Sequence, residues 1–437
     1  MTGQIEIETP AAAGVSFWVL LRLLLKLPRN AVSITNSDEF DRCVPGNLVT
    51  AAAGAQVRAA ARSPNPRPFP PMKSLRVPPR CRFLPAAAAL LLAAGALAAK
   101  NAAKNQEIDY EFFPPPPDEP HLQYLTGFSS EQEMGKNTSR SFASWLTGRA
   151  PAKREISKPY GIAVRDHVLY ICDTDYGAIL KADLKTHSMS VLQARGQGVL
   201  RIPLNVAIDA TGEIYVADSG RDQVVVFDKD EHHLATIGKL GEMKPRDVAV
   251  GPERLYVADI QNHNVHVYDK ATRHPLFTIP READTKIPAR QLYSPTNLAL
   301  DGAGHLYAAD TGGFRIQVYD AADGSYVRTV GQMGDGLGQF ARVKGIAVDR
   351  DARLYAVDAM SQVTQIFNDQ GRLLTWLAEP GGSGGPKSLP AKVMVDYDDV
   401  PFFASKIAPG FQVEYLVFVV NQVGPHLVSV YGFGHPK

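Results

Sequence analysis

The 437-residue chain has few cysteines and almost no net charge. Its three cysteines, Cys43, Cys81 and Cys172, form no CxxC pair, which excludes a disulfide framework, a cysteine-based zinc site and covalent haem attachment. The 46 Lys and Arg residues are balanced by 45 Asp and Glu residues, which argues against a chain-wide electrostatic attraction to nucleic acid. Apolar residues make up 45% of the chain, enough to bury a large core.

The first part of the chain lacks the periodic pattern of a folded domain. Residues 1–71 have no sustained period, and their apolar run is interrupted by two basic residues, so we predict no structure and no membrane span there. Residues 99–120 form a proline-rich linker in which Phe112-Phe113 precedes four prolines. Such a segment adopts an extended polyproline helix, which serves either as a stiff spacer or as a strap laid along a surface.

Residues 72–98 have the order of a secretory signal peptide. A basic stretch is followed by an apolar run, which ends in the small-x-small site Ala96-Leu97-Ala98. Because such a signal must lie at the N-terminus, we predict that translation begins at Met72 and that residues 1–71 are an over-extended start. Cleavage near Ala98 then gives an extracytoplasmic protein, periplasmic or secreted. The alternative is that residues 83–99 remain as an N-terminal membrane anchor.

One sequence unit recurs six times from residue 159 to the end of the sequence. In each unit an apolar start is followed by an aromatic residue three positions before an Asp or Asn, then by an alternating apolar stretch and a shorter one. The units begin at Pro159, Pro203, Pro245, Pro295, Val343 and Pro390, so the period averages about 46 residues. Four short strands repeated at this spacing predict an all-β fold, a six-bladed β-propeller of four-stranded antiparallel blades.

The number of strands predicts how the ring closes. The last unit ends after its third strand, whereas residues 121–128 resemble the fourth strand of the other units. We therefore predict that residues 121–128 complete the last blade and that the propeller domain spans residues 121–437. Closure of this kind hides two sheet edges that would otherwise be open to aggregation.

The repeat resembles the NHL repeat. The resemblance rests on the PYGIAV start at Pro159, on the LYVAD pattern followed by VxVFD in the middle of the unit, and on the glycine-rich approach 331–340. It covers residues 159–437. It implies a six-bladed propeller like those of exported, bacterial-type NHL-repeat proteins, in a family used mainly to bind proteins or nucleic acids, with some enzymatic relatives.

Five carboxylates occupy the same position in the repeat, at the end of the second strand. We predict that they are structural, because Asp in such a turn accepts backbone N–H groups. They lie in different blades and away from the axis, too far apart to bind one metal ion together, so we predict no metal and no cofactor. The residues are Asp173, Asp218, Asp259, Asp310 and Asp358.

Nine basic residues flank the entry to the first strand or follow the second strand of the units. Because these loops emerge on the same face of a propeller, we predict that the side chains ring one mouth of the central channel. Such a ring is a seat for an acidic partner or a phosphate-bearing ligand, although a solvated rim and a nucleic-acid surface are alternatives. The residues are Lys158, Arg201, Arg221, Lys244, Arg246, Arg315, Arg342, Lys344 and Lys392.

The last unit contains an insertion, residues 397–411, between its first and second strands. This loop is expected on the face opposite the basic ring, and its aromatic residues suit an interface. The alternative is that they fold back over the closing blade and cover Phe112 and Phe113. The aromatic residues are Tyr397, Phe402, Phe403 and Phe411.

Signals for catalysis are weak, and we assign no catalytic residue. The literal GxSxG match at residues 381–385 is a glycine-rich loop without the strand-to-helix turn of a nucleophile elbow. We predict an exported, monomeric, non-catalytic scaffold that binds other exported proteins, with no nucleic-acid partner and no membrane span in the mature chain. Two alternatives stay open. One is a metal-dependent propeller lyase or lactone hydrolase, for which only Asp247 lies near the required position, and the other is an RNA-binding NHL domain.

Overall fold

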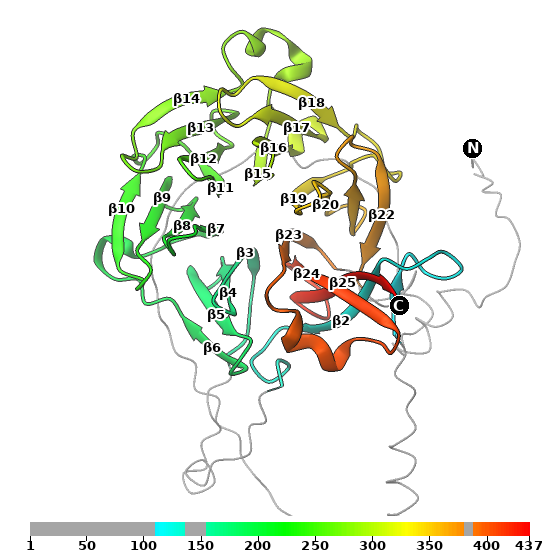
Figure 1. Ribbon diagram of the computed structural model, residues 1–437. Helices are drawn as coiled ribbons and strands as arrows, with labels where there is room; N and C mark the ends of the chain where they lie inside the picture. Colours follow the sequence, from blue (N-terminus) through cyan, green and yellow to red (C-terminus); the bar gives the residue numbers. More distant parts are fainter. Residues whose placement is uncertain (1–109, 136–153, 380–387) are drawn as a thin grey trace, which may run out of the picture. The chain divides into compact units, whose positions relative to one another are not determined.

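The computed structural model describes residues 110–135, 154–379 and 388–437, which form a ring of six β-sheets (Figure 1). The prediction of an all-β, six-bladed propeller is therefore confirmed. The predicted over-extended start, the signal peptide and its cleavage site, the first part of the linker and the 381–385 loop lie outside the described residues. No helix in the described ranges is long and apolar enough to cross a membrane.

Five blades are antiparallel sheets of four consecutive strands. The first contains β3 (Pro159–Arg165), β4 (Val168–Asp173), β5 (Ala178–Asp183) and β6 (Ser188–Val191). The second contains β7 (Pro203–Ile208), β8 (Ile214–Asp218), β9 (Gln223–Phe227) and β10 (His233–Ile237). The third contains β11 (Pro245–Val250), β12 (Arg254–Asp259), β13 (Asn264–Asp269) and β14 (Pro275–Ile279). The fourth contains β15 (Pro295–Leu300), β16 (His305–Asp310), β17 (Arg315–Asp320) and β18 (Tyr326–Val330). The fifth contains β19 (Val343–Val348), β20 (Leu354–Asp358), β21 (Val363–Phe367) and β22 (Leu373–Ala378).

The sixth blade joins the two ends of the propeller. Its strands are β23 (Pro390–Asp396), β24 (Phe411–Asn421), β25 (Val428–Pro436), β2 (Leu122–Phe128) and β1 (Phe112–Phe113), in the order β1-β2-β25-β24-β23. The predicted closing strand is confirmed, since β2 pairs antiparallel with β25 from Leu122 opposite Phe433 to Phe128 opposite Val428. Figure 1 shows the cyan β2 beside the red β25. The segment before β2 also lies against this blade, because β1 pairs with β2 and Phe113 is buried.

The core lies between the blades, because the middle strands bury both of their faces. In β8, Ile214 and Val216 pack with Tyr170 of the first blade, whereas Tyr215 and Ala217 pack towards the third blade. Successive side chains of a strand point to opposite sides of the sheet, so one strand contributes to two clusters. A blade on its own would expose both clusters, and each blade therefore depends on its two neighbours.

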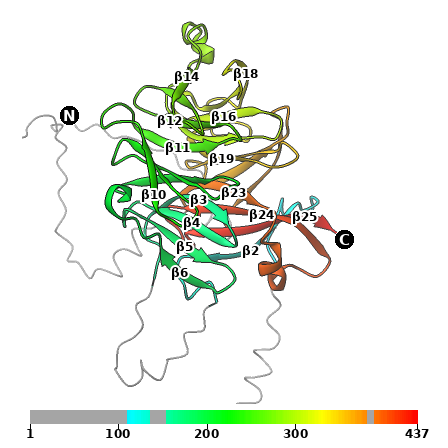
Figure 2. The same ribbon diagram turned by 60° about the vertical axis from the view of Figure 1, so that its left-hand side comes forward.

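The topology gives the ring two different faces. The inner strands, including β3, β11, β19 and β23, surround the centre of the ring (Figure 1), and Figure 2 shows the same ring turned by 60°. We call the side on which the chain enters these strands the entry face. It is formed by the loops 154–158, 192–202, 238–244, 280–294, 331–342 and 388–389, and by the turns 174–177, 219–222, 260–263, 311–314, 359–362 and 422–427. Short 3-10 helices η1 (Gly196–Gly198), η2 (Asp284–Lys286), η3 (Pro288–Arg290) and η4 (Thr311–Gly313) belong to it, whereas η6 (Val400–Lys406) lies in the insertion of the sixth blade.

Candidate functional site at the mouth of the central channel

The repeat carboxylates fix the loops of the entry face. Asp218 is fully buried, and its carboxylate accepts the backbone N–H groups of Arg201 at 2.6 Å, Ile202 at 2.9 Å and Gly220 at 3.0 Å. The bond to Gly220 is the expected turn contact, whereas the two others tie the loop that precedes β7. Asp173, Asp259, Asp310 and Asp358 are bonded in similar ways to the loops before their own inner strands.

Asp259 shows how such a buried carboxylate stays ionised. Burial alone would raise its pKa, but hydrogen bonds from His266, at 2.9 Å, and from the backbone N–H of Lys244, also at 2.9 Å, lower the pKa below its usual range. Both carboxylate oxygens of Asp259 thus accept hydrogen bonds from other groups of the chain. The carboxylates therefore hold the entry loops in one arrangement and leave other side chains free to face outwards.

An ion pair crosses the channel axis. Strands β23 and β11 belong to opposite blades, yet Lys392 Nζ lies 2.7 Å from Asp247 Oδ2. Asn297 Nδ2 at 3.2 Å and the Leu298 backbone N–H at 2.9 Å donate to the same oxygen, and Oδ1 accepts the Val248 N–H at 2.8 Å. Both charged side chains are almost completely buried. Donors of the chain therefore occupy both carboxylate oxygens of Asp247.

A tyrosine lies next to this ion pair on the entry side. Tyr160 packs against Leu204 and Ala391, and its ring centroid is 5.5 Å from Lys344 Nζ and 5.7 Å from the guanidinium of Arg246. These four neighbours come from four other blades. Since only a residue near the axis can contact so many blades, Tyr160 marks the mouth of the channel.

The mouth carries positive charge without a carboxylate partner. Lys344 is only 7% exposed, and its ammonium donates to the amide oxygen Gln422 Oε1 at 3.3 Å. Burial, together with the charges of Arg342 and Arg246, lowers the pKa of Lys344 to about 8. The Nε atom of Arg246 is buried and has no hydrogen-bond partner among the described residues.

The nine basic residues predicted to ring the mouth fall into three groups. Arg246, Lys344 and Lys392 lie at the axis as described above. Arg221 and Arg315 are held by their own loops, Arg221 through the carbonyl oxygens of Gln197 and Val199 and Arg315 through those of Pro288 and Gln291. The others are exposed and make no side-chain hydrogen bond or ion pair within the described ranges. They are Lys158, Arg201, Lys244 and Arg342.

Exposed apolar side chains are concentrated on the same face. Fourteen large apolar residues of the described ranges are exposed, and four of these lie on outermost strands: Leu234, Leu276, Val327 and Leu374. The other ten all belong to the entry face. They are Tyr176, Val199, Ile202, Leu240, Ile287, Tyr293, Met333, Leu337, Met360 and Val423. Sequence reasoning missed this set, because a single apolar residue in a loop carries no periodic signal.

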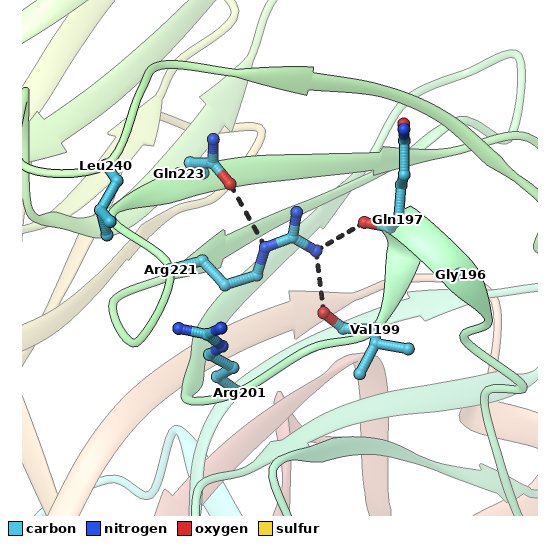
Figure 3. Close-up of a pocket in the computed structure, with 7 residues that line it drawn as sticks. All are labelled: Gly196, Gln197, Val199, Arg201, Arg221, Gln223 and Leu240. Carbon is cyan, nitrogen blue, oxygen red and sulfur yellow. Dashed lines mark hydrogen bonds between the residues drawn. The ribbon is translucent and has the colours of Figure 1, made fainter.

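One pocket of about 330 Å³ combines both kinds of residue. It is lined by Gly196, Gln197, Val199, Arg201, Arg221, Gln223 and Leu240. Figure 3 shows Arg221 bonded to Gln197, Val199 and Gln223, whereas Arg201 carries no such bond. With Leu240 75% exposed and Val199 51% exposed, the pocket offers one free guanidinium between two apolar side chains.

The aromatic insertion lies on the sixth blade. Phe403 is 8% exposed and lies 6.1 Å from the ring of Phe418, and Phe411 is 4% exposed and lies 5.3 Å from Phe112. Tyr397 packs on Tyr415, and Phe402 packs on His167. Gln123 of β2, which is fully buried, donates to the carbonyl of Lys406 and accepts the N–H of Ala408. This is the arrangement of the packing alternative, in which the aromatic residues cover the closing blade and Phe112.

An acidic pocket of about 390 Å³ lies on the side opposite the entry face. Its lining includes His167, Asp396 and Asp399. Burial, with the neighbouring charge of Asp399, raises the pKa of Asp396 to about 6, and the hydrogen bond to Asp399 raises the pKa of His167. Within the described ranges no group of three or more His, Cys, Asp or Glu residues is arranged to hold a metal ion.

Comparison with known proteins gives matches among solved structures only. No family model matches the chain, so the NHL-repeat assignment stays a prediction, and no curated protein matches it. A gluconolactonase from Xanthomonas campestris is 15% identical, covers 75% of this chain and 96% of its own, and has a TM-score of 0.49. Virginiamycin B lyase from Staphylococcus aureus is 11% identical, with 64% and 86% covered and a TM-score of 0.43.

A chain of a nidogen–laminin complex is 17% identical, covers 59% of this chain and 93% of its own, and has a TM-score of 0.43. The three similar structures are thus two enzymes and one chain of a protein complex. At these identities and TM-scores, the similarities transfer neither an activity nor a partner to this chain.

Proposed function

We propose that the chain is a non-catalytic binding scaffold and that its entry face binds a partner protein. The observation that carries this proposal is the sidedness of the surface. Exposed large apolar side chains and unpaired cations share the entry face, whereas no exposed large apolar residue lies on the loops of the opposite face in the described ranges. A face that combines exposed apolar residues with unpaired cations is typical of an interaction site.

The chemistry of the face specifies the kind of partner. Its free cations, such as Arg201 and Arg342, complement acidic side chains of a partner. Its exposed apolar residues, such as Leu240 and Met333, would be buried against apolar side chains of the same partner. The proposed partner is therefore a protein with an acidic segment interspersed with apolar residues. The hydrogen bonds of the repeat carboxylates hold the loops in place before binding, which lowers the entropy lost on association.

The signal-peptide pattern at residues 72–98 supports an extracytoplasmic scaffold. On this proposal the partner is another exported protein. The metal-dependent enzyme is less well supported, because Lys392 and its neighbours already bind the carboxylate of Asp247.

Affinity capture with matched surface variants tests this function. Leu240→Asp places a charge on the entry face, and Leu374→Asp places the same charge on an outermost strand, where Leu374 is 54% exposed. We expect immobilised wild-type protein and Leu374→Asp to capture the same proteins from the extracytoplasmic fraction. Leu240→Asp should capture them with at least about tenfold lower yield, since interface centres tolerate charge poorly. Equal capture by both variants, with equal melting temperatures, would refute the proposal.

A further inference from the structure

We propose that Tyr160, Arg246 and Lys344 form a binding site for a single oxyanionic group, a carboxylate or a phosphate, at the mouth of the channel. The site lies on the entry face but does not depend on the partner protein proposed above. A free anion and a carboxylate carried by a protein are both possible sources of this group.

The first reason is that Lys344 lacks the partner that other poorly exposed cations of this protein have. The ammonium of Lys392 lies 2.7 Å from Asp247, and the guanidinium of Arg353 lies 2.7 Å from Asp349. Lys344 is at least as well buried as Lys392, yet it contacts only a neutral amide oxygen, at 3.3 Å. A buried charge without a counter-charge is costly, so an anion from outside would stabilise this arrangement.

The second reason is that two cations gather around one ring. Arg246 and Lys344 each lie within 6 Å of the Tyr160 centroid, on strands of the third and fifth blades. Arg342 is close enough to contribute to the lowered pKa of Lys344. The Nε–H of Arg246 is buried without an acceptor among the described residues. Guanidinium and ammonium donors of this kind are the usual ligands of carboxylates and phosphates.

The third reason is that, among the described residues, no carboxylate on the channel side of the mouth neutralises the charges of Arg246 and Lys344. Asp247 is the carboxylate at the axis, and its oxygens are taken by Lys392, Asn297 and two backbone N–H groups. None of the salt bridges in the described ranges involves Arg246, Arg342 or Lys344. The floor of the site is apolar, since Tyr160 packs on Leu204 and Ala391. The site therefore offers positive charge above an apolar surface.

Thermal unfolding and calorimetry with free anions test the site. The probes are inorganic phosphate and acetate, each compared with chloride at the same ionic strength and pH 7, and a capped hexaglutamate peptide as the carried carboxylate. We expect a saturable rise in the melting temperature of the wild-type protein with at least one probe. A response to phosphate alone identifies a phosphate site. A response to acetate identifies a free carboxylate, and a response to the peptide alone identifies a carboxylate presented by a protein.

Variants assign the response to these residues. In chloride, Lys344→Met should melt higher than the wild-type protein, because it removes a buried, repelled charge, and its melting temperature should not respond to the anion. Arg246→Gln should also lose the response and serves as the second test if Lys344→Met does not fold. Arg372→Met, which removes an exposed cation after β21, should respond like the wild-type protein. The proposal is overturned if no probe raises the wild-type melting temperature, or if Lys344→Met and Arg246→Gln respond like the wild-type protein.

Discussion

At the scale of single residues, two buried lysines at corresponding ends of neighbouring inner strands have different surroundings. Lys392 lies on β23 and is paired with Asp247 across the axis, whereas Lys344 lies on β19 and faces other cations. Both are less than a tenth exposed. The pair contributes to joining opposite blades, while Lys344 retains a charge that the fold does not compensate.

Removing one partner of the axial pair should destabilise the ring. Lys392→Met leaves the carboxylate of Asp247 buried without its cation, and we expect a loss of about 3–5 kcal/mol in the free energy of unfolding. In the double variant with Asp247→Asn, the carboxylate is gone as well, so the loss should be smaller than for Lys392→Met alone. Urea denaturation at pH 7 measures both losses. Strictly additive effects of the two substitutions would contradict the coupling.

The stability of the protein should depend on pH through Lys344. Its pKa is about 8 in the folded protein and 10.5 in the unfolded chain, so its charge opposes folding below pH 8. Between pH 8 and pH 10.5 the folded protein binds fewer protons than the unfolded chain, and stability therefore rises with pH. The charged or polar groups facing the ammonium are Arg246, Arg342, Tyr160 and Gln422.

Chemical denaturation from pH 7 to pH 10.5 checks this dependence, with Lys344→Met as the reference. The same tyrosines titrate in both proteins, so their contributions cancel in the difference. The free energy of unfolding of the wild-type protein should increase relative to the variant over this range. A constant difference would show that Lys344 has an ordinary pKa.

The sequence predicted nine basic residues around the mouth, of which the structure brings Arg246, Lys344 and Lys392 to the axis, but it could not predict how they pair. Lys392 and Asp247 are 145 residues apart, and their contact exists only because six blades close into a ring. Arg201 and Arg221 were both predicted as free cations of the rim. They differ because the partners of Arg221 are backbone carbonyl groups, which have no sequence signature.

At the scale of elements, the repeat pattern in the sequence determines the strands but not the entry loops. The strands could be predicted because their anchors recur, for example Tyr215 with Asp218 and Tyr256 with Asp259. The entry loops differ in length and composition from blade to blade, so their shape depends on contacts that the repeat does not encode. The insertion 397–411 left two alternatives open, since aromatic residues suit a core and an interface equally well.

The insertion should contribute to stability and not to partner binding. Phe403→Ala removes a ring that is 8% exposed and packs on Phe418, and we expect it to lower the free energy of unfolding by about 3 kcal/mol. Ser405→Ala, at an exposed position of the same short helix, is the control and should change stability little. Urea denaturation and the capture assay are the two measurements. Lost capture with unchanged stability in Phe403→Ala would favour an interface instead.

At the scale of the whole molecule, the ring depends on its closure. Each blade buries its faces against two neighbours, and β2 supplies the strand that the last repeat lacks. This part of the fold was predicted from strand counting, since an incomplete last unit and an extra strand before the first unit have one simple solution. The additional pairing of β1 with β2 was not predicted, because a strand of two residues is too short to show the alternation of apolar and polar side chains.

Deleting residues 121–128 should open the ring. The deletion removes β2, exposes the edge of β25 and uncovers Leu416 and Val430, so the melting temperature should fall by roughly 10 °C or more and the protein should aggregate more readily. Asp118→Ala, in the exposed turn before β2, should leave the melt unchanged. Differential scanning calorimetry makes the comparison. An unchanged melt after the deletion would mean that β2 does not close the ring.

Amide hydrogen exchange, measured on the free protein and on its complex with a captured partner, tests the central claim most directly. The account predicts slower exchange in the entry loops 192–202, 238–244 and 331–342, together with unchanged exchange in the loops of the opposite face and in the insertion 397–411. Protection confined to the opposite face or to the insertion would contradict the assignment of the entry face as the binding surface.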